Sequence, residues 1–479
     1  MNLAVAIERV DQLVHQVVGA HRFSQDQYNQ LVKYVVDCLA YDPEISREDA
    51  KLLVTMLMTD KFTASYQFNP ESLFNQRGFS DRVRITCAAD LVSHQFDYAG
   101  DTFRESKYLE RQHRIELLKA IPQAEQKSDA WFAQREKCLT ATAVAAALDE
   151  CPHTLPAELL LAKCGRGKPF VENLPVHHGK KYEQIGTLYY SYRYNVTMAE
   201  YGLLQHDTIK HIGASPDGIC EMYNNDGGLT KLVGRLLEIK FPFWRRVAFE
   251  GRLNGDKCPH YYYMQVQTQL FVTGMPTCDF LQCKIIEYNT WDEYLQDTAP
   301  GMPGLSARSG LEKGCLIQLF PKDRVTASKD QDTDDRLLYA RYIYPPRLHM
   351  TPEEIKTWLA EQMINFHTHP LHGKYLIDRV IYWKLIVASV NTIHYEKESF
   401  EQRFPELEQF WDLVKFYRKH PKQLDQLHAF IKSEGDSQSA KIFKKAQEAY
   451  QSKYPDDKRE PLYQSTNPWR EEYNKKKRK

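Results

Sequence analysis

The sequence predicts an α/β protein in which a mixed, twisted sheet flanked by helices is joined to helical N- and C-terminal extensions. Small-residue helical segments, β-rich runs and glycine turns alternate through residues 123–297, which predicts the sheet-containing core. The apolar spacing is mostly helical in residues 1–122 and 298–479, which predicts the two extensions. Hydrophobic residues make up 42% and charged residues 26% of the chain, so it can bury a sizeable core.

The N-terminal region is predicted to be helical, with no signal for membrane insertion. Ser46 precedes a run of apolar residues at helical spacing, and residues 103–120 form a further predicted helix that Ile121-Pro122 ends. Charged side chains interrupt the first twenty residues, so these lack the apolar region of a secretion signal. An apolar stretch at 380–390 is too short to span a bilayer. We therefore expect an intracellular protein that makes no membrane contact.

Within the core, two short motifs predict a charged site on one face of the sheet. The motif Ser-Pro-Asp217-Gly is followed, after a hairpin-like break at 225–228, by Leu-Glu238-Ile-Lys240. Because alternate residues of a strand share a face, Glu238 and Lys240 point the same way while their apolar neighbours point into the opposite layer. A preceding strand that ends at Asp217 can pair alongside and bring its carboxylate beside Glu238.

Two carboxylates and a lysine in this arrangement suit metal-dependent phosphodiester hydrolysis. Asp217 and Glu238 would hold Mg²⁺, which lowers the pKa of a bound water and neutralises charge on the leaving oxygen. Lys240 would orient that water and stabilise developing negative charge. The simpler interpretation is a surface strand of alternating charge, because Glu-x-Lys also occurs at Glu105 and Glu354. The upstream Ser-Pro-Asp217-Gly motif favours the catalytic interpretation.

Two predicted helices supply further site candidates, Glu183 and Gln265. Glu183 lies in the first turn of a helix, where a carboxylate either points toward a site or simply interacts favourably with the helix dipole. Residues 261–273 are predicted to form a helix in which Tyr262, Gln265 and Gln269 share one face. That face lies against the metal site or against solvent, and the spacing alone leaves both open.

The C-terminal region is predicted to be mostly helical with a basic tail. Thr351-Pro-Glu-Glu354 has the cap, the first-turn proline and the glutamate of a capping box. Helical apolar spacing continues through 371–394 and 406–419. The basic run at 475–479 is a nuclear-import signal, a non-specific phosphate contact or a solvated tail. The first of these predicts a nuclear location.

The charge balance confines any nucleic-acid contact to a local surface. Lysine plus arginine and aspartate plus glutamate both number 63, so the chain has no overall positive field for a polyanion. The 10 cysteines include no CxxC pair and none follows Cys315, which argues against a zinc ribbon and a secreted disulfide framework. We interpret them as free thiols, mostly structural.

Four ordered blocks of the core resemble the λ-exonuclease/YqaJ family of the PD-(D/E)XK nuclease superfamily. That family includes the alkaline nucleases of large DNA viruses such as herpesviruses and baculoviruses, and the C-terminal region looks most like the baculovirus type. The blocks are Ser128-x-x-Trp131-x-x-x-Arg135 leading to Thr140-Ala-Thr142, Gly179-Lys-Lys-Tyr-Glu183, Ser215-Pro-Asp217-Gly with Leu237-Glu238-Ile-Lys240, and Tyr262-x-x-Gln265-Val-Gln267. They cover residues 128–273. The resemblance implies a PD-(D/E)XK core between helical extensions.

The resemblance also implies which residues form the catalytic site. The implied catalytic and metal-binding residues are Glu183, Asp217, Glu238, Ile239 through its carbonyl, Lys240 and Gln265. Two Mg²⁺ ions are expected, with Mn²⁺ as an alternative. In this reading Lys240 assists the nucleophilic water, and Glu183 and Gln265 line the site.

A second implied site recognises the DNA end. Arg135 together with Thr142 would hold a terminal 5′-phosphate, since a guanidinium fork suits phosphate oxygens. The family usually has serine where this chain has Thr142, which keeps the hydroxyl but has a stiffer rotamer. Further DNA-contact candidates are Trp131, Lys181, Tyr262 and Arg245. The alternatives are core packing for the tryptophan and plain solvation for the two basic residues.

The resemblance implies an alkaline deoxyribonuclease that degrades double-stranded DNA from its ends in the 5′→3′ direction. It further implies a role in viral DNA replication, recombination or genome processing, in the host nucleus, with a single-strand-binding or annealing protein as partner. We expect a monomer, because the long extensions can shape the DNA groove within one chain. The rival functions are a structure-selective endonuclease or RNase using the same site, and a nucleic-acid-binding scaffold whose site has decayed. The complete set of site residues argues against decay.

Overall fold

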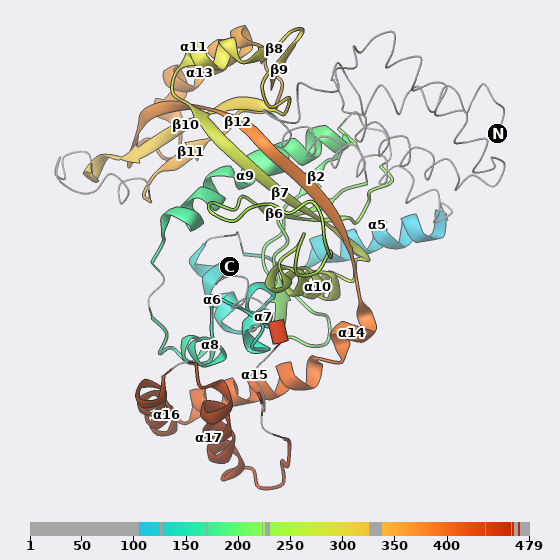
Figure 1. Cartoon of the computed structure of the whole chain (residues 1–479), viewed down its shortest axis with the longest axis vertical. Coiled ribbons are helices and arrows are strands. Elements are labelled where there is room, and N and C mark those ends of the chain that lie inside the picture. The colour runs from blue at the N-terminus through green and yellow to red at the C-terminus, as the bar shows by residue number, and fades with distance from the viewer. Residues whose placement is uncertain are drawn as a thin grey trace.

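The computed structural model describes most of the chain after residue 104 (Figure 1). The described residues are 105–124, 126, 128–168, 171–222, 224–225, 230–324, 338–435, 437–460, 462–463 and 468–469. The helix predicted after Ser46, most of the predicted break at 225–228 and the basic run at 475–479 lie outside these residues.

A seven-stranded sheet forms the centre of the described fold. Its strands, in spatial order, are β11 (Arg341–Ile343), β10 (Lys313–Pro321), β12 (Tyr375–His394), β7 (Thr277–Tyr288), β6 (Leu236–Lys240), β5 (Gly218–Cys220) and β2 (Met198–Ala199). Strands β6 and β7 are parallel, and every other neighbouring pair is antiparallel. The predicted mixed sheet is therefore confirmed.

Helices flank this sheet, as predicted. They are α5 (Glu105–Ala120), α6 (Asp129–Glu136), α7 (Ala141–Ala147), α8 (Pro156–Lys163), α9 (Leu174–Tyr194), α10 (His260–Thr273), α11 (Trp291–Gln296), α13 (Pro352–Asn365), α14 (Lys397–Glu401), α15 (Phe404–Lys419), α16 (Pro421–Glu434) and α17 (Ser439–Gln451), with 3-10 turns at Lys322–Arg324 and Phe366–Thr368. Helix α5 confirms the helix predicted over 103–120, and α15 that over 406–419.

Strand β6 is covered by a different helix on each face. Helix α9 packs on the face that carries Leu237 and Ile239, and α10 packs on the face that carries Leu236 and Glu238. Helix α10 is also the crossover that parallel strands β6 and β7 require. Gly186 of α9 allows the close packing, because a Cβ there would lie 2.6 Å from the Ile239 Cγ2 atom.

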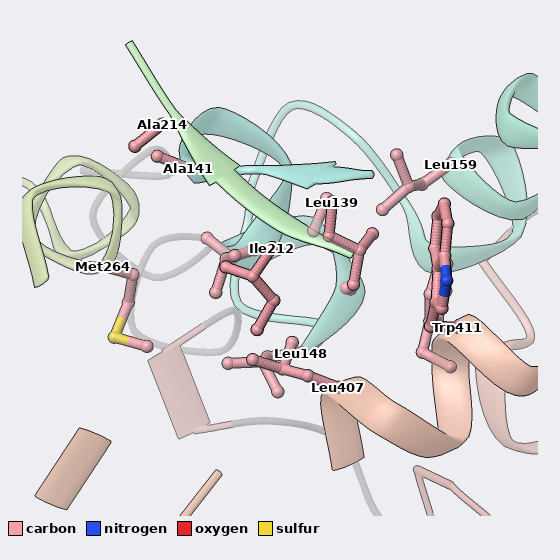
Figure 2. Close-up of a cluster of buried hydrophobic side chains, with 14 of the residues drawn as sticks. Leu139, Ala141, Leu148, Leu159, Ile212, Ala214, Met264, Leu407 and Trp411 are labelled. Carbon is pink, nitrogen blue, oxygen red and sulfur yellow. The ribbon is translucent and has the colours of Figure 1, made fainter. Parts of the chain in front are cut away.

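A second, small sheet brings the first family block next to the core. It has the order β1 (Leu139–Thr140), β4 (Ile212–Ala214) and β3 (Leu204–Gln205), with β1 and β4 parallel. Figure 2 shows Leu139 and Ile212 of this sheet in one apolar cluster with Met264 of α10 and with Leu407 of α15. The C-terminal helices therefore pack directly on the segment that contains the predicted end-binding residues.

The helices that follow β7 lie in two groups at opposite ends of the described structure (Figure 1). Helices α11 and α13 and the hairpin β8 (Thr298–Ala299) to β9 (Met302–Ser306) lie near β10 and β11, whereas α16 and α17 lie at the far end (Figure 1). The predicted capping box of α13 is present: Glu354 N donates to Thr351 Oγ1 at 3.2 Å, and Thr351 N donates to Glu354 Oε2 at 2.8 Å.

One predicted helix is wrong. Residues 371–394 have helical apolar spacing, but Tyr375–His394 is strand β12, paired with β10 on one side and β7 on the other. A strand buried within a sheet reads as a nearly continuous apolar run, which periodicity alone cannot distinguish from a buried helix. Its β-branched and aromatic residues favour a strand. The sheet thus includes strands from both sides of the predicted boundary at residue 297.

The described residues contain neither a disulfide bond nor a helix that could span a membrane. The eight cysteines among the described residues are all free thiols, and all but Cys164 are buried. Among the same residues no helix combines the length and apolarity that crossing a membrane requires.

Candidate functional site

Asp217 directly precedes strand β5 and lies at the open edge of β6. Strand β5 pairs with β6 only through Gly218 with Leu237 and Ile219 with Leu236, so β6 continues past it. At that point the Asp217 Oδ2 atom accepts a hydrogen bond from the Ile239 backbone N at 2.7 Å. The two motifs are therefore adjacent, as predicted, but the strand that pairs with β6 begins after Asp217, whereas the sequence predicted a strand that ends there.

Glu238 is fully buried and held by three side chains. Gln265 Nε2 donates to Glu238 Oε1 at 2.7 Å, and Gln269 Nε2 donates to Glu238 Oε2 at 2.6 Å. Lys240 forms an ion pair with Glu238 Oε1. The glutamine face of α10 thus lies against the site and not against solvent. Gln269 was missing from the predicted site residues, although its place one turn beyond Gln265 was the available signal.

The electrostatics of the site are dominated by clustered negative charge. The pKa of Asp217 is raised well above its usual value by burial, then by the nearby charges of Glu238 and Glu183. Burial alone would lower the pKa of Lys240, but attraction by Glu238, Tyr262 and Asp217 outweighs it and raises that pKa. A cation bound among these carboxylates would relieve their repulsion.

A cavity of about 1260 Å³ reaches this cluster at Lys240, although Asp217 and Glu238 are not part of its lining. Its lining includes Glu183, Ile239, Lys240, Arg245 and Tyr262. The Lys240 Nζ atom lies 4.7 Å from the centroid of the Tyr262 ring, a cation–π contact. A substrate entering the cavity would therefore meet the predicted catalytic lysine and the predicted DNA-contact residues together.

The donors at this edge fit a Mg²⁺ ion. Along a strand, the N–H and C=O of one residue point to the same side, so the Ile239 carbonyl points toward the edge where its N–H meets Asp217. Among the described residues no three His, Cys, Asp or Glu side chains form a metal-holding group. Mg²⁺ commonly binds one or two carboxylates and completes its shell with water and substrate phosphate. Asp217, Glu238 and the Ile239 carbonyl supply such a set.

Arg135 and Thr142 come together as predicted. Arg135 Nη2 donates to Thr142 Oγ1 at 3.2 Å, and its guanidinium carbon lies 4.3 Å from the centroid of the Trp131 ring. Trp131 Nε1 in turn donates to Ser215 Oγ at 3.3 Å. Since Ser215 is two residues before Asp217, the predicted end-binding pair is connected to the carboxylate site through Trp131. Trp131 is half-buried and links the two sites.

The backbone of the segment that follows Arg135 is held by two cations from other helices. Lys163 Nζ, from α8, donates to the carbonyl oxygens of Arg135 and Cys138, both at 2.7 Å. Arg418 Nη2, from α15, donates to the carbonyl oxygens of Glu136 and Lys163, both at 2.6 Å. The carbonyls of Arg135 and Glu136 end α6 and that of Lys163 ends α8, so these contacts satisfy groups that have no partner within their helices.

Of the predicted DNA contacts, Arg245 lines the cavity and Lys181 does not. Arg245 lines the cavity, where its Nη2 donates to Gln282 Oε1 at 2.7 Å. The side chain of Lys181 is only 9% exposed and forms an ion pair with Glu287 Oε1 at 2.6 Å, away from the cavity lining. The prediction for Lys181 is therefore corrected: a buried, paired lysine stabilises the packing of α9 on the sheet and is not available to phosphate.

Comparisons with known proteins identify the family of this chain. Residues 130–276, which contain both clusters, match the YqaJ-like viral recombinase domain. The chain is 43% identical to the uncharacterized protein R354 of Acanthamoeba polyphaga mimivirus, over 98% of this chain and 95% of that protein.

Two solved structures show more remote likeness. They are an alkaline exonuclease, LHK-Exo, from Laribacter hongkongensis (16% identity, TM-score 0.31) and LHK-Exo in complex with dAMP (17% identity, TM-score 0.32), each covering 62% of this chain and 98% of the other. Likeness at this level carries no argument about activity. From the domain match and the viral relative, the chain belongs to the YqaJ-like viral recombinase family, the nuclease family of the λ-exonuclease type that its motifs resemble.

Proposed function

We propose that this protein is a Mg²⁺-dependent deoxyribonuclease that degrades one strand of double-stranded DNA from a 5′-phosphorylated end. The observation that carries the proposal is the direct connection of two sites. Asp217, beside Glu238, lies two residues from Ser215, and Ser215 bonds Trp131 of the Arg135 cluster. A terminal phosphate at Arg135 and a phosphodiester at Asp217 would thus belong to the same strand.

The residues at the carboxylate site have separable roles. Asp217, Glu238 and the Ile239 carbonyl would hold Mg²⁺, which when bound supplies an activated water and neutralises charge on the leaving oxygen. Gln265 and Gln269 fix both oxygens of Glu238, so the carboxylate cannot rotate away. Lys240, kept protonated by Glu238, stabilises negative charge that develops on the phosphate. We place Glu183 at the edge of this site, where it lines the cavity.

The end-binding pair would select the substrate. The Arg135 guanidinium is fixed by the Trp131 ring and by Thr142, so its remaining N–H groups are directed before DNA binds. The biological setting we propose is viral DNA replication, recombination or genome processing in the host nucleus. A single-strand-binding or annealing protein would take up the exposed strand, and the nuclease itself would act as a monomer.

The test compares end-dependent with end-independent cleavage. We expect wild type with Mg²⁺ to degrade linear duplex bearing a 5′-phosphate, to act more slowly on a 5′-hydroxyl end, and to leave closed circular duplex intact. Chelation with EDTA, Asp217→Ala and Lys240→Ala should each abolish cleavage. Arg135→Ala should remove the preference for the phosphorylated end.

A matched control uses the Glu-x-Lys motif at Glu354. Lys356 lies on helix α13, outside the cavity lining, so Lys356→Ala should retain wild-type activity. Full activity in Asp217→Ala and Lys240→Ala, or none in wild type with Mg²⁺, would refute the nuclease proposal. Rapid cleavage of closed circles would favour the endonuclease function instead, and cleavage of RNA alone would favour an RNase.

A further inference from the structure

Trp244 is the most exposed large apolar side chain among the described residues. It is 79% exposed and lines the cavity that contains Lys240 and Tyr262. An indole of this size is ordinarily buried, so one that faces a functional cavity indicates a binding role. Neither the catalytic site nor the end-binding pair uses it.

The backbone around Trp244 is anchored, so its exposure is a built feature of the loop. Phe243 meets Trp244 edge to face, with ring centroids 4.3 Å apart and planes at 86°. Phe243 packs edge to face against His178 of α9, at 5.1 Å, and its carbonyl accepts a hydrogen bond from Lys284 Nζ at 2.9 Å. The neighbouring residue holds the loop and leaves a face of the indole open.

Basic side chains flank the indole. Arg245 and Arg246 follow it directly and line the same cavity, and Arg245 is fixed by its bond to Gln282 Oε1. Two of the carboxylates that also line the cavity are neutralised: Glu150 by Arg403, and Asp256 by Arg252. An exposed aromatic ring beside two arginines combines a stacking surface with phosphate-binding groups.

We propose that Trp244 is a stacking platform for an unpaired nucleobase of the DNA strand held in the cavity. This inference rests on the proposed nuclease function and adds a base-binding position to it. Trp244 is four residues from Lys240, so the two Cα atoms are at most about 14 Å apart. Stacked nucleotides are spaced about 3.4 Å along a strand. The stacked base therefore lies within about four nucleotides of the bond that is cut.

An unpaired base suits this position better than a base within a duplex. The flat face of a paired base is covered by its neighbours, whereas an unpaired base can present that face to the indole. Stacking of this kind tolerates any base, which a nuclease acting on arbitrary sequences needs. The platform would hold a frayed strand end open next to the carboxylates, and so favour strand separation before cleavage.

The test is a binding scan with short single-stranded DNA. Full-length protein in EDTA is titrated with fluorescein-labelled oligonucleotides of eight nucleotides that carry a 5′-phosphate and one abasic site, moved position by position. Wild type should lose affinity when the abasic site falls at one position within about four nucleotides of the cleaved bond. Trp244→Ala should bind the intact oligonucleotide about 5- to 150-fold more weakly, which is the usual value of one base–aromatic stack, and should show a flat scan.

Controls separate stacking from general damage. Trp244→Phe keeps a ring and should retain most of the affinity and the position dependence. Ile364→Ala removes an apolar side chain that is 71% exposed on α13, outside the cavity lining, and should behave as wild type. Because Trp244 is exposed, its variants should keep the wild-type melting temperature.

The outcomes distinguish this inference from the proposed function. The stacking role would be overturned if the affinity of wild type did not depend on the position of the abasic site, or if wild type and Trp244→Ala bound with equal affinity, even if the protein cuts DNA. Loss of affinity for a protein partner with unchanged DNA binding would also overturn it. Absence of Mg²⁺-dependent cleavage by wild type would overturn the nuclease proposal, and cleavage is measured separately, in the assay with linear and circular DNA.

Discussion

Lys163 should make the stability of this protein rise with pH across the mildly alkaline range. Its ammonium group is enclosed between α6 and α8, where it donates to the carbonyls of Arg135 and Cys138. Burial lowers the pKa of Lys163 to about 8, although the neighbouring Cys138 acts in the opposite direction. The unfolded chain restores the ordinary pKa of about 10.4. Between these values the unfolded state binds more protons, so raising the pH favours the folded state.

The magnitude follows from the two pKa values. Titration of this one group should add about 1 kcal/mol to the free energy of unfolding between pH 7 and pH 9. The neutral amine can still donate to both carbonyls, so the end-binding segment keeps its support at alkaline pH. Lys163→Met removes the titrating group, and its free energy of unfolding should lack this increment while the rest of the pH dependence is retained.

The assay is urea unfolding of wild type and Lys163→Met at pH 7, 8 and 9, followed by circular dichroism. The quantity compared is how the difference in free energy of unfolding between wild type and Lys163→Met changes with pH, because groups remote from Lys163 titrate equally in both proteins. Lys168→Met is the matched control, since the Lys168 side chain is 85% exposed and its charge is screened by water. An unchanged difference from pH 7 to pH 9, or a wild type that loses stability relative to the variant, would refute the reasoning.

Two further predictions concern side chains whose roles the structure revealed. Gln269→Leu removes the donor to Glu238 Oε2 and should lower kcat about 10- to 150-fold with little change in KM, as expected for a lost hydrogen bond to a charged group. Gln267→Leu is the control, because Gln267 lies on the same helix but donates to the His394 carbonyl, and this variant should retain activity. Equal kcat values in the two variants would contradict the role of Gln269. Lys181→Met removes the ammonium partner of Glu287, which keeps its bond from the Tyr182 hydroxyl and its ion pair with Arg379. The free energy of unfolding should fall by about 1–3 kcal/mol, less than for a fully buried pair because Glu287 is 37% exposed, while DNA affinity stays within about twofold. Weaker DNA binding at unchanged stability in a fluorescence titration would restore Lys181 as a phosphate contact.

Local sequence signals predicted the parts of the structure that depend on nearby residues. The capping box at Thr351 fixes the start of α13 through two bonds between residues three apart, and it formed as expected. The pairing of the Asp217 and Glu238 motifs also followed from a short connection between two strands. In both cases the interacting groups lie close together along the chain.

The features that the sequence did not reveal depend on distant partners. Tyr375–His394 forms a strand because β7 and β10 supply hydrogen-bonding edges on both sides, and nothing within the segment specifies those edges. Whether Gln269 faced the site or solvent depended on how α10 sits on β6. Nothing local distinguishes Lys181 from its exposed neighbour Lys180, because the ion-pair partner that buries Lys181, Glu287, lies over a hundred residues later in the chain.

The long strand β12 has a consequence for the order in which the protein is made. It pairs with β7 along twelve residues, from Tyr382 with Tyr288 to His394 with Thr277, yet the ribosome adds it about a hundred residues after β7. At about 5–20 residues per second, the outer edge of β7 is left without its partner for about 5–20 seconds during synthesis. An unpaired apolar edge is a site for aggregation. Chains truncated before residue 375 should therefore be poorly soluble, and nuclease activity should emerge only once translation has passed this strand.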